Sequence, residues 1–212
     1  YVERRSPAPL VDLELLRNRL LIASTVGILI GAGTITGLMF VLSLYFQSPD
    51  TLGLNALDTG LATLPATVGL VVLAPVVPNL AKKWGSRPVI AAGFALMTAG
   101  FAVLIATQVS WRYAAFVLPL VLVAAGLALS NGPCSSLATS SVPTAQVGAA
   151  SGISNMARYV GAAVMTAVVA SVYGTVSADR VDDGESTGDA LASAFAWSAV
   201  VMTVVSASGI AL

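Results

Sequence analysis

Six long apolar stretches dominate this sequence, and each is long enough to cross a lipid bilayer as a helix. A membrane-spanning helix needs about 20 predominantly apolar residues. The stretches lie at approximately 20–46, 59–81, 88–107, 113–139, 146–173 and 190–212. An outer-membrane barrel is excluded, because its strands alternate polar and apolar residues and these stretches do not. The sequence therefore predicts an all-α membrane protein, a bundle of six transmembrane helices.

The composition agrees with a bilayer as the solvent. Apolar residues make up 57% of the chain and charged residues only 9%, whereas roughly 25% of a soluble protein is charged. A globule of this composition could not cover its surface with polar side chains, but lipid-facing positions must be apolar. No cluster of lysines and arginines interleaves with aromatic residues, so we expect no nucleic-acid partner.

The sequence offers little material for catalysis or for metal binding. It contains no histidine and a single cysteine, Cys134. A disulfide within the chain and a Ser–His catalytic pair are therefore excluded, and a His/Cys metal site nearly so. The apolar stretches also lack an acidic pair. We expect a protein that is not an enzyme and that holds neither a metal nor a cofactor.

The segment before the first apolar stretch is polar. Residues 1–19 lack the apolar core of a signal peptide, and the sequence stops at Leu212 within an apolar run. We interpret the sequence as a fragment of a longer chain, with a cytoplasmic segment at 1–19 and a six-span bundle at 20–212. Residues 10–19 mix leucines with charges, which fits an interfacial helix and fits a frayed start of the first span equally well.

Basic residues concentrate on one side of the predicted bundle. If six spans alternate in direction, that side carries Arg4, Arg5, Arg17, Arg19, Lys82, Lys83 and Arg87. The opposite side carries Arg112 and Arg180, the latter in an acidic segment at 177–189 that we expect to be a solvated external loop. Because basic residues favour the cytoplasmic side, both ends of the fragment are expected in the cytoplasm.

One charge is predicted deep in the bilayer. Arg158 lies 12 residues after Gln146, about 18 Å along a helix axis and so near the middle of a core about 30 Å thick. An arginine there costs about 2.5–3.5 kcal/mol and should face protein or water. Arg158 and Asn155, three residues earlier on the same face, are candidates for the polar wall of a substrate passage. Alternatively, Arg158 serves only structure, by hydrogen-bonding a neighbouring helix or by snorkelling.

Two further polar residues are candidates for a substrate cavity. Asn131 stands in the fourth span beside Gly132 and Pro133, and Gln47 stands at the external end of the first span. No aspartate or glutamate lies deep in any span, and Asp58 is only at the external mouth of the second. Since proton-coupled transport places a protonatable carboxylate in the membrane, a coupling acid would lie outside this sequence.

Small residues and prolines mark the predicted packing surfaces. Glycines recur at four-residue spacing in Gly27/Gly31, Gly33/Gly37 and Gly148/Gly152, a pattern that lets helix backbones approach closely. Prolines interrupt the second and fourth spans, and each can bend its helix. The prolines concerned are Pro65, Pro75, Pro78, Pro119 and Pro133.

The order of motifs resembles the major facilitator superfamily, specifically the carboxy-terminal half of its fourteen-span drug/proton antiporter branch. The segment 147–163, VGAASGISNMARYVGAA, is similar to the family's thirteenth-span signature, and Asn155 and Arg158 match its polar positions. LLRNR at 15–19 resembles the element before the ninth span. LGLNALDTGLATLP at 52–65 resembles the loop and helix start that follow.

A degraded copy of the family's loop motif "G-x-L-A-D-R-x-G-R-R" occupies residues 79–88. Its gating candidates in this sequence are Leu80, Ala81, Lys82, Lys83, Gly85 and Arg87. Leu80, Ala81, Gly85 and Arg87 agree with the motif, but Lys82 stands in the aspartate position. In the family that aspartate joins a charge network that locks one conformation. An ammonium only donates hydrogen bonds, so the lock is in doubt here.

The resemblance implies two six-helix bundles, each made of two inverted three-helix repeats, with substrate bound between the bundles. The repeats here would be 20–107 and 113–212. The implied function is proton-coupled efflux of small organic compounds, such as drugs or antibiotics, across a bacterial cytoplasmic membrane by alternating access. The implied partners are the bilayer, protons, a small organic substrate and a missing amino-terminal half. A facilitator for a specific metabolite and a non-transporting scaffold or receptor remain alternatives.

Overall fold

The computed structural model describes residues 17–212, and helices account for nearly all of them. Arg4, Arg5 and most of the predicted interfacial helix at 10–19 lie outside the described residues. The α-helices are α1 (Arg19–Gln47), α2 (Ala56–Ala62), α3 (Leu64–Leu73), α4 (Val77–Trp84), α5 (Ser86–Leu104), α6 (Tyr113–Ser140), α7 (Val147–Asp182) and α8 (Thr187–Ser208). Two short 3-10 helices, η3 (Thr144–Gln146) and η4 (Gly209–Ala211), complete the described fold.

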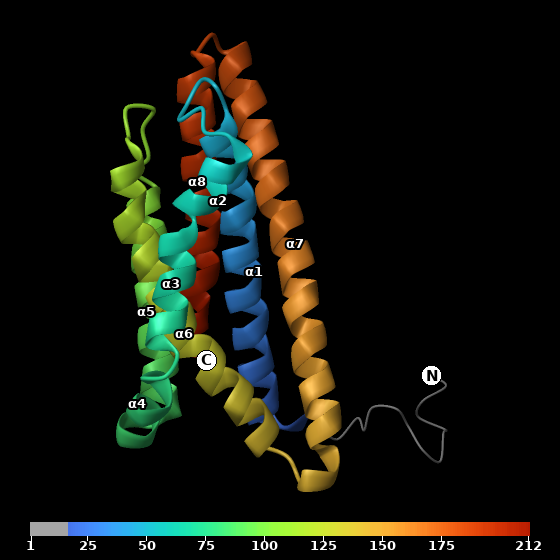
Figure 1. Ribbon diagram of the computed structural model, residues 1–212. Helices are drawn as coiled ribbons and strands as arrows, with labels where there is room; N and C mark the ends of the chain where they lie inside the picture. Colours follow the sequence, from blue (N-terminus) through green and yellow to red (C-terminus); the bar gives the residue numbers. More distant parts are fainter. Residues whose placement is uncertain (1–16) are drawn as a thin grey trace, which may run out of the picture.

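The prediction of an all-α membrane protein with six spanning helices is confirmed. Over the described part of the chain, six helical stretches are long and apolar enough to cross a bilayer. Five are essentially continuous helices, namely α1, α5, α6, α7 and α8, and the remaining one is formed by α2 and α3. Figure 1 shows them as a bundle whose long axes run in roughly the same direction.

The second crossing departs from the single span predicted at 59–81. The predicted stretch is divided into three pieces, of which α2 and α3 form the crossing and α4 follows it, and the breaks coincide with prolines. Pro65 stands in the first turn of α3 and Pro78 in the first turn of α4, where the missing N–H leaves no hydrogen bond unmade. Pro119 and Pro133 instead lie inside α6, which continues through both.

The segment at 177–189 is not the open loop that its acidic residues predicted. The helix α7 continues to Asp182, and α8 begins at Thr187 after a cap in which Ser186 Oγ accepts a hydrogen bond from the Asp189 N–H. Arg180 stands in the last turn of α7, where a cation interacts favourably with the helix dipole. Its guanidinium donates to Glu185 Oε1 at 2.5 Å. These interactions stabilise helical structure in a segment whose many acidic residues had predicted a loop.

The order of helix contacts fits two inverted three-helix repeats. The helices that begin each repeat, α1 and α6, contact each other, and so do the helices that end each repeat, α5 and α8. The middle elements are exchanged, because α3 packs on α6 while α7 packs on α1. Since α1 and α6 are the first and fourth crossings and run in opposite directions, the approximate twofold axis lies in the membrane plane, as in inverted repeats.

Close backbone contact joins the helices at glycines. On Gly33, which faces α7, a Cβ atom would lie 2.7 Å from the Gly161 carbonyl oxygen. On Gly93, a Cβ atom would lie 2.7 Å from the Gly126 oxygen of α6. The predicted close packing at Gly148 and Gly152 is wrong, since no atom lies within 4 Å of a Cβ placed on either. The spacing pattern alone could not say which glycine pairs meet a neighbouring helix.

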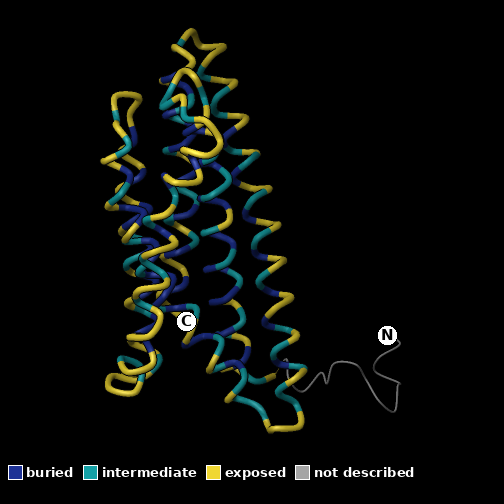
Figure 2. The backbone as a smooth tube through the Cα atoms, in the orientation of Figure 1, coloured by how far each residue is buried: buried dark blue, intermediate teal, exposed yellow. Residues whose placement is uncertain are grey.

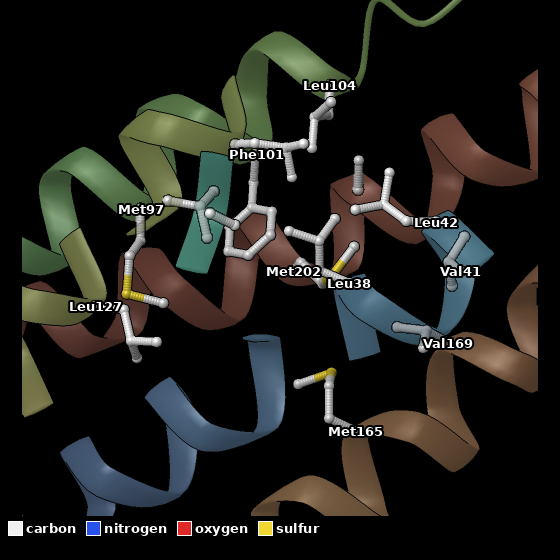
Figure 3. Close-up of a cluster of buried hydrophobic side chains, with 14 of the residues drawn as sticks. Leu38, Val41, Leu42, Met97, Phe101, Leu104, Leu127, Met165, Val169 and Met202 are labelled. Carbon is white, nitrogen blue, oxygen red and sulfur yellow. The ribbon is translucent and has the colours of Figure 1, made fainter. Parts of the chain in front are cut away.

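Apolar side chains from all the long helices fill the interior. Figure 3 shows Leu38 of α1, Phe101 of α5, Leu127 of α6, Met165 of α7 and Met202 of α8 around one core. An aromatic cluster continues the core toward the end where α1 finishes, with Tyr45 and Phe46 against Phe116 and Phe195. Figure 2 shows the buried positions on the inward sides of the helices, whereas much of α3, α4 and α7 is exposed.

The α1–α7 contact yields a test of packing in the complete natural protein. We expect Gly161→Ala to lower the free energy of unfolding by about 1–3 kcal/mol, because its Cβ would overlap the Leu29 carbonyl oxygen. Thermal unfolding in detergent measures the change. Gly152→Ala, on the same helix but facing open space, is the matched control. Equal unfolding temperatures for the two variants would contradict the assigned contact.

Candidate functional site

Charges separate to the two ends of the bundle. One end, here called the basic end, carries Arg17, Arg19, Lys82, Lys83 and Arg87 and no acidic residue among those described. The other, the acidic end, carries Asp50, Asp58, Asp179, Asp182, Asp183, Glu185 and Asp189, together with Arg112 and Arg180. Arg158 is the charge that the described structure places between the two ends.

Arg158 lies on α7, eleven residues after the helix begins at Val147, about 17 Å along the axis at 1.5 Å per residue. Its side chain is half-buried at the edge of the face that packs on α1, next to the buried Ala157. Among residues 17–212, no hydrogen bond or ion pair of its guanidinium is found. Asn155, one turn earlier, is exposed. A hydrogen bond from Arg158 to a neighbouring helix, one of the two structural alternatives beside snorkelling, is thus not observed among the described residues.

Four hydroxyl groups that the sequence did not single out lie unpaired in the described interior, those of Thr25, Ser154, Tyr173 and Ser206. Ser154 Oγ of α7 and Thr25 Oγ1 of α1 are buried without a hydrogen-bond partner. Other buried hydroxyls in the bundle donate to their own helix, as Thr34 does to the Ile30 carbonyl and Ser198 to the Ala194 carbonyl. Ser154 is one turn before Arg158 on α7, so one of these unpaired hydroxyls lies within a helical turn of the unpaired guanidinium. Unpaired buried polar atoms of this kind call for a water molecule or a ligand.

A cavity of about 590 Å³ opens between α3, α4 and α6. We call it the α3–α4–α6 cavity. Its wall is formed by Leu70, Ala74, Val77, Pro78, Ala81, Lys82, Ser86, Ala128, Asn131, Gly132, Pro133 and Ser136. Two predicted groups of residues therefore meet here, because Asn131 was a substrate-cavity candidate while Ala81 and Lys82 belong to the loop motif.

The remaining candidates lie elsewhere. Gln47 is exposed at the last turn of α1, where its side-chain amide donates to Ser43 Oγ at 2.7 Å. Arg87 lines a second, smaller cavity of about 300 Å³, whose wall also includes the buried Cys134. Leu80, Lys83 and Gly85 do not line the α3–α4–α6 cavity. The structure thus unites Asn131 with Lys82 and keeps Arg158 and Asn155 apart from them on α7.

Backbone geometry explains how the loop motif presents Lys82. Gly85 ends α4 with a φ of 87°, a conformation that favours glycine, and α5 begins at the next residue. The turn directs Lys82 and Ser86 to the α3–α4–α6 cavity while Arg87 lines the smaller one. Neighbouring residues of the loop motif therefore line two separate cavities.

The sequence profile of the Major Facilitator Superfamily matches residues 2–166. The multidrug resistance protein Stp of Mycobacterium tuberculosis is 31% identical over 173 residues, 81% of this chain and 32% of that protein. The multidrug efflux pump LfrA of Mycolicibacterium smegmatis is 27% identical over 180 residues, 85% of this chain and 35% of that protein. The tetracenomycin C resistance and export protein of Streptomyces glaucescens is 28% identical over 181 residues, 85% of this chain and 32% of that protein.

The aligned part of the chain spans about a third of the length of these relatives. The family profile covers more than half of the chain and includes both the loop motif and the first part of α7, with Arg158. A six-helix, multi-pass membrane bundle with inverted repeats agrees with that match. The chain therefore belongs to the major facilitator superfamily, a family of membrane transporters.

Proposed function

We propose that this chain is the carboxy-terminal six-helix half of a secondary transporter that exports small organic compounds by alternating access. The observation that carries the proposal is the similarity to relatives named for multidrug resistance, multidrug efflux and tetracenomycin C export. The order of motifs supports the carboxy-terminal position within the fourteen-span branch. In this reading the bundle at 20–212 works with an amino-terminal half of the same polypeptide.

Unequal burial of the helices supports a second bundle as a neighbour. Within the most apolar 18-residue stretch of each crossing, only 17% of α2–α3 and 22% of α7 is buried, against 44–56% for α1, α5, α6 and α8. The approximate twofold axis relates these two poorly buried crossings to each other. Both therefore offer broad apolar faces for a partner bundle or lipid, and rocking of one bundle against another would use such faces.

Proton coupling needs an acid that this bundle does not supply. The acidic residues of the described structure all lie at the acidic end, and the deepest of them, Asp58, is in the first turn of α2. A protonatable carboxylate that drives antiport should lie within the membrane. We assign it to the amino-terminal half, so that this bundle shapes the passage while the other half binds the proton.

The first test is transport by the complete natural protein in sealed vesicles. We expect uptake of an amphipathic dye into inverted vesicles while a proton gradient is present. Dissipating the gradient with nigericin and valinomycin should reduce uptake to the rate of protein-free vesicles, because export against a concentration difference needs the gradient. Uptake that persists unchanged without the gradient would exclude antiport and favour a facilitator.

A second test concerns orientation, which we propose to place the basic end in the cytoplasm, because basic residues favour that side. The sole cysteine of this sequence, Cys134, is buried, so Cys134→Ala, together with replacement of any cysteine elsewhere in the complete protein, provides a cysteine-free background. In intact bacterial cells, a membrane-impermeant maleimide should label Asp183→Cys at the acidic end and should not label Lys83→Cys until the cells are opened. The reverse pattern would invert the proposed topology.

A third test addresses Arg158, which we propose to line the substrate passage together with Asn155. Arg158→Ala should lower the transport rate roughly tenfold or more, since a hydrogen bond to a charged group is lost. Arg158→Lys should restore part of the rate. Arg180→Gln, on the same helix but paired with Glu185 at the acidic end, is the matched control. Unchanged transport by Arg158→Ala at normal expression would remove Arg158 from the passage.

A further inference from the structure

The α3–α4–α6 cavity has one charged side chain in its wall, the ammonium of Lys82. The polar groups beside it are Ser86, Asn131 and Ser136, and the other lining residues are apolar or glycine. Carboxylates are absent from this wall, and all described acidic residues lie at the far, acidic end. A ligand in this cavity therefore meets a positive charge that the described residues leave uncompensated.

Lys82 has no partner among the described residues. Its side chain is exposed and makes no hydrogen bond or ion pair within residues 17–212. The nearest titratable groups in the sequence, Lys83 and Arg87, are also basic, so they add to the positive potential. An ammonium in a concave apolar surface attracts anions more strongly than one on an open surface, because the low-dielectric wall focuses the field.

The polar groups are arranged along the length of the cavity. Lys82 is two residues before the end of α4, at the basic end. Asn131 lies nine residues before the end of α6, about 14 Å along the helix axis from that end at 1.5 Å per residue. Its half-buried amide makes no hydrogen bond to any described residue. Val77 and Ala128 contribute apolar wall to the same cavity.

We infer that the α3–α4–α6 cavity binds amphipathic organic anions, with the carboxylate or sulfonate at Lys82, the apolar body against α3 and α6, and a polar group at Asn131. The inference rests on the proposed function and adds a substrate class to it. Lys82 and Ser86 place the cavity near the basic end, which we propose to lie in the cytoplasm, where an exporter takes up its substrate. Its volume of about 590 Å³ falls in the range of about 300–1,000 Å³ that is usual for drug-sized ligands. Organic cations are disfavoured by the same ammonium.

The test is equilibrium binding to the complete natural protein, purified in detergent. Tritiated 1-naphthaleneacetate is the anionic probe, and unlabelled 1-naphthaleneacetamide and 1-naphthylmethylamine are competitors of nearly the same size, one neutral and one cationic. We expect the anion to displace the labelled probe at the lowest concentration, the amide at a higher one and the amine at the highest. An amine that competes as well as the anion would overturn the inference.

Variants at two adjacent lysines isolate the contact. Lys82→Gln should raise the dissociation constant of 1-naphthaleneacetate by roughly tenfold or more, and Lys82→Arg should keep it within about threefold because the charge remains. Lys83→Gln removes an equal charge from the neighbouring residue, which does not line the cavity, and should change it by less than about twofold since exposed charges are screened. Gel filtration establishes that each variant is folded.

Two further results would overturn the inference. One is an equal loss of binding in Lys82→Gln and Lys83→Gln, which would mean a general surface field. The other is displacement of the probe by one equivalent of dioleoylphosphatidylglycerol, which would mean that a lipid occupies the cavity. Failure of the proposed function is distinguishable, because binding in detergent needs no transport. Selective anion binding without transport in vesicles would refute the exporter, whereas transport with unchanged binding in Lys82→Gln would refute only the anion site.

Discussion

The contact of helix backbones at glycines is the interaction on which the rest of this bundle depends. Lipid tails are as apolar as the helices, so burial alone does not drive helices together in a bilayer, and close packing must do so. Gly33 against Gly161 joins α1 to α7, and Gly93 against Gly126 joins α5 to α6. The broken second crossing is held less closely: α3 contacts α6, but α4 makes few contacts. The α3–α4–α6 cavity lies beside α4, the loosely held segment that follows this crossing.

The helices could be predicted from the sequence because a bilayer imposes length and apolarity on every crossing. Prolines located the interruptions of the second crossing, where Pro65 and Pro78 begin new helices, but they also suggested interruptions in the fourth, where α6 stays continuous. The choice depends on which neighbours accept the freed carbonyl groups. The length of α7 was missed for a similar reason, because a cap at Ser186 and the Arg180–Glu185 ion pair order a segment rich in acids.

Only part of the candidate site could be predicted from the sequence. Arg158 could be found because a charge in an apolar stretch is conspicuous, and Asn131 could be found because it interrupts another. The sequence could not show that Arg158 and Asn131 lie in two separate places. Their separation depends on α4 and α6 meeting in space, while α7 packs on the far side of the bundle against α1. The unpaired hydroxyl of Ser154 depends on its rotamer, and no sequence pattern distinguishes it from serines that donate to their own helix.

Lys82 stands at a position where the resembled loop motif has an aspartate. An aspartate at this position would accept hydrogen bonds and could tie the loop to basic neighbours, whereas an ammonium can only donate. In a cluster that already contains Lys83 and Arg87, a third positive charge repels its neighbours. It is therefore suited to hold an external anion better than to lock the loop. With lysine in place of aspartate, a position associated with closing the transporter becomes one that is suited to bind a ligand. An anion bound there would also reduce the repulsion between Lys82 and its basic neighbours.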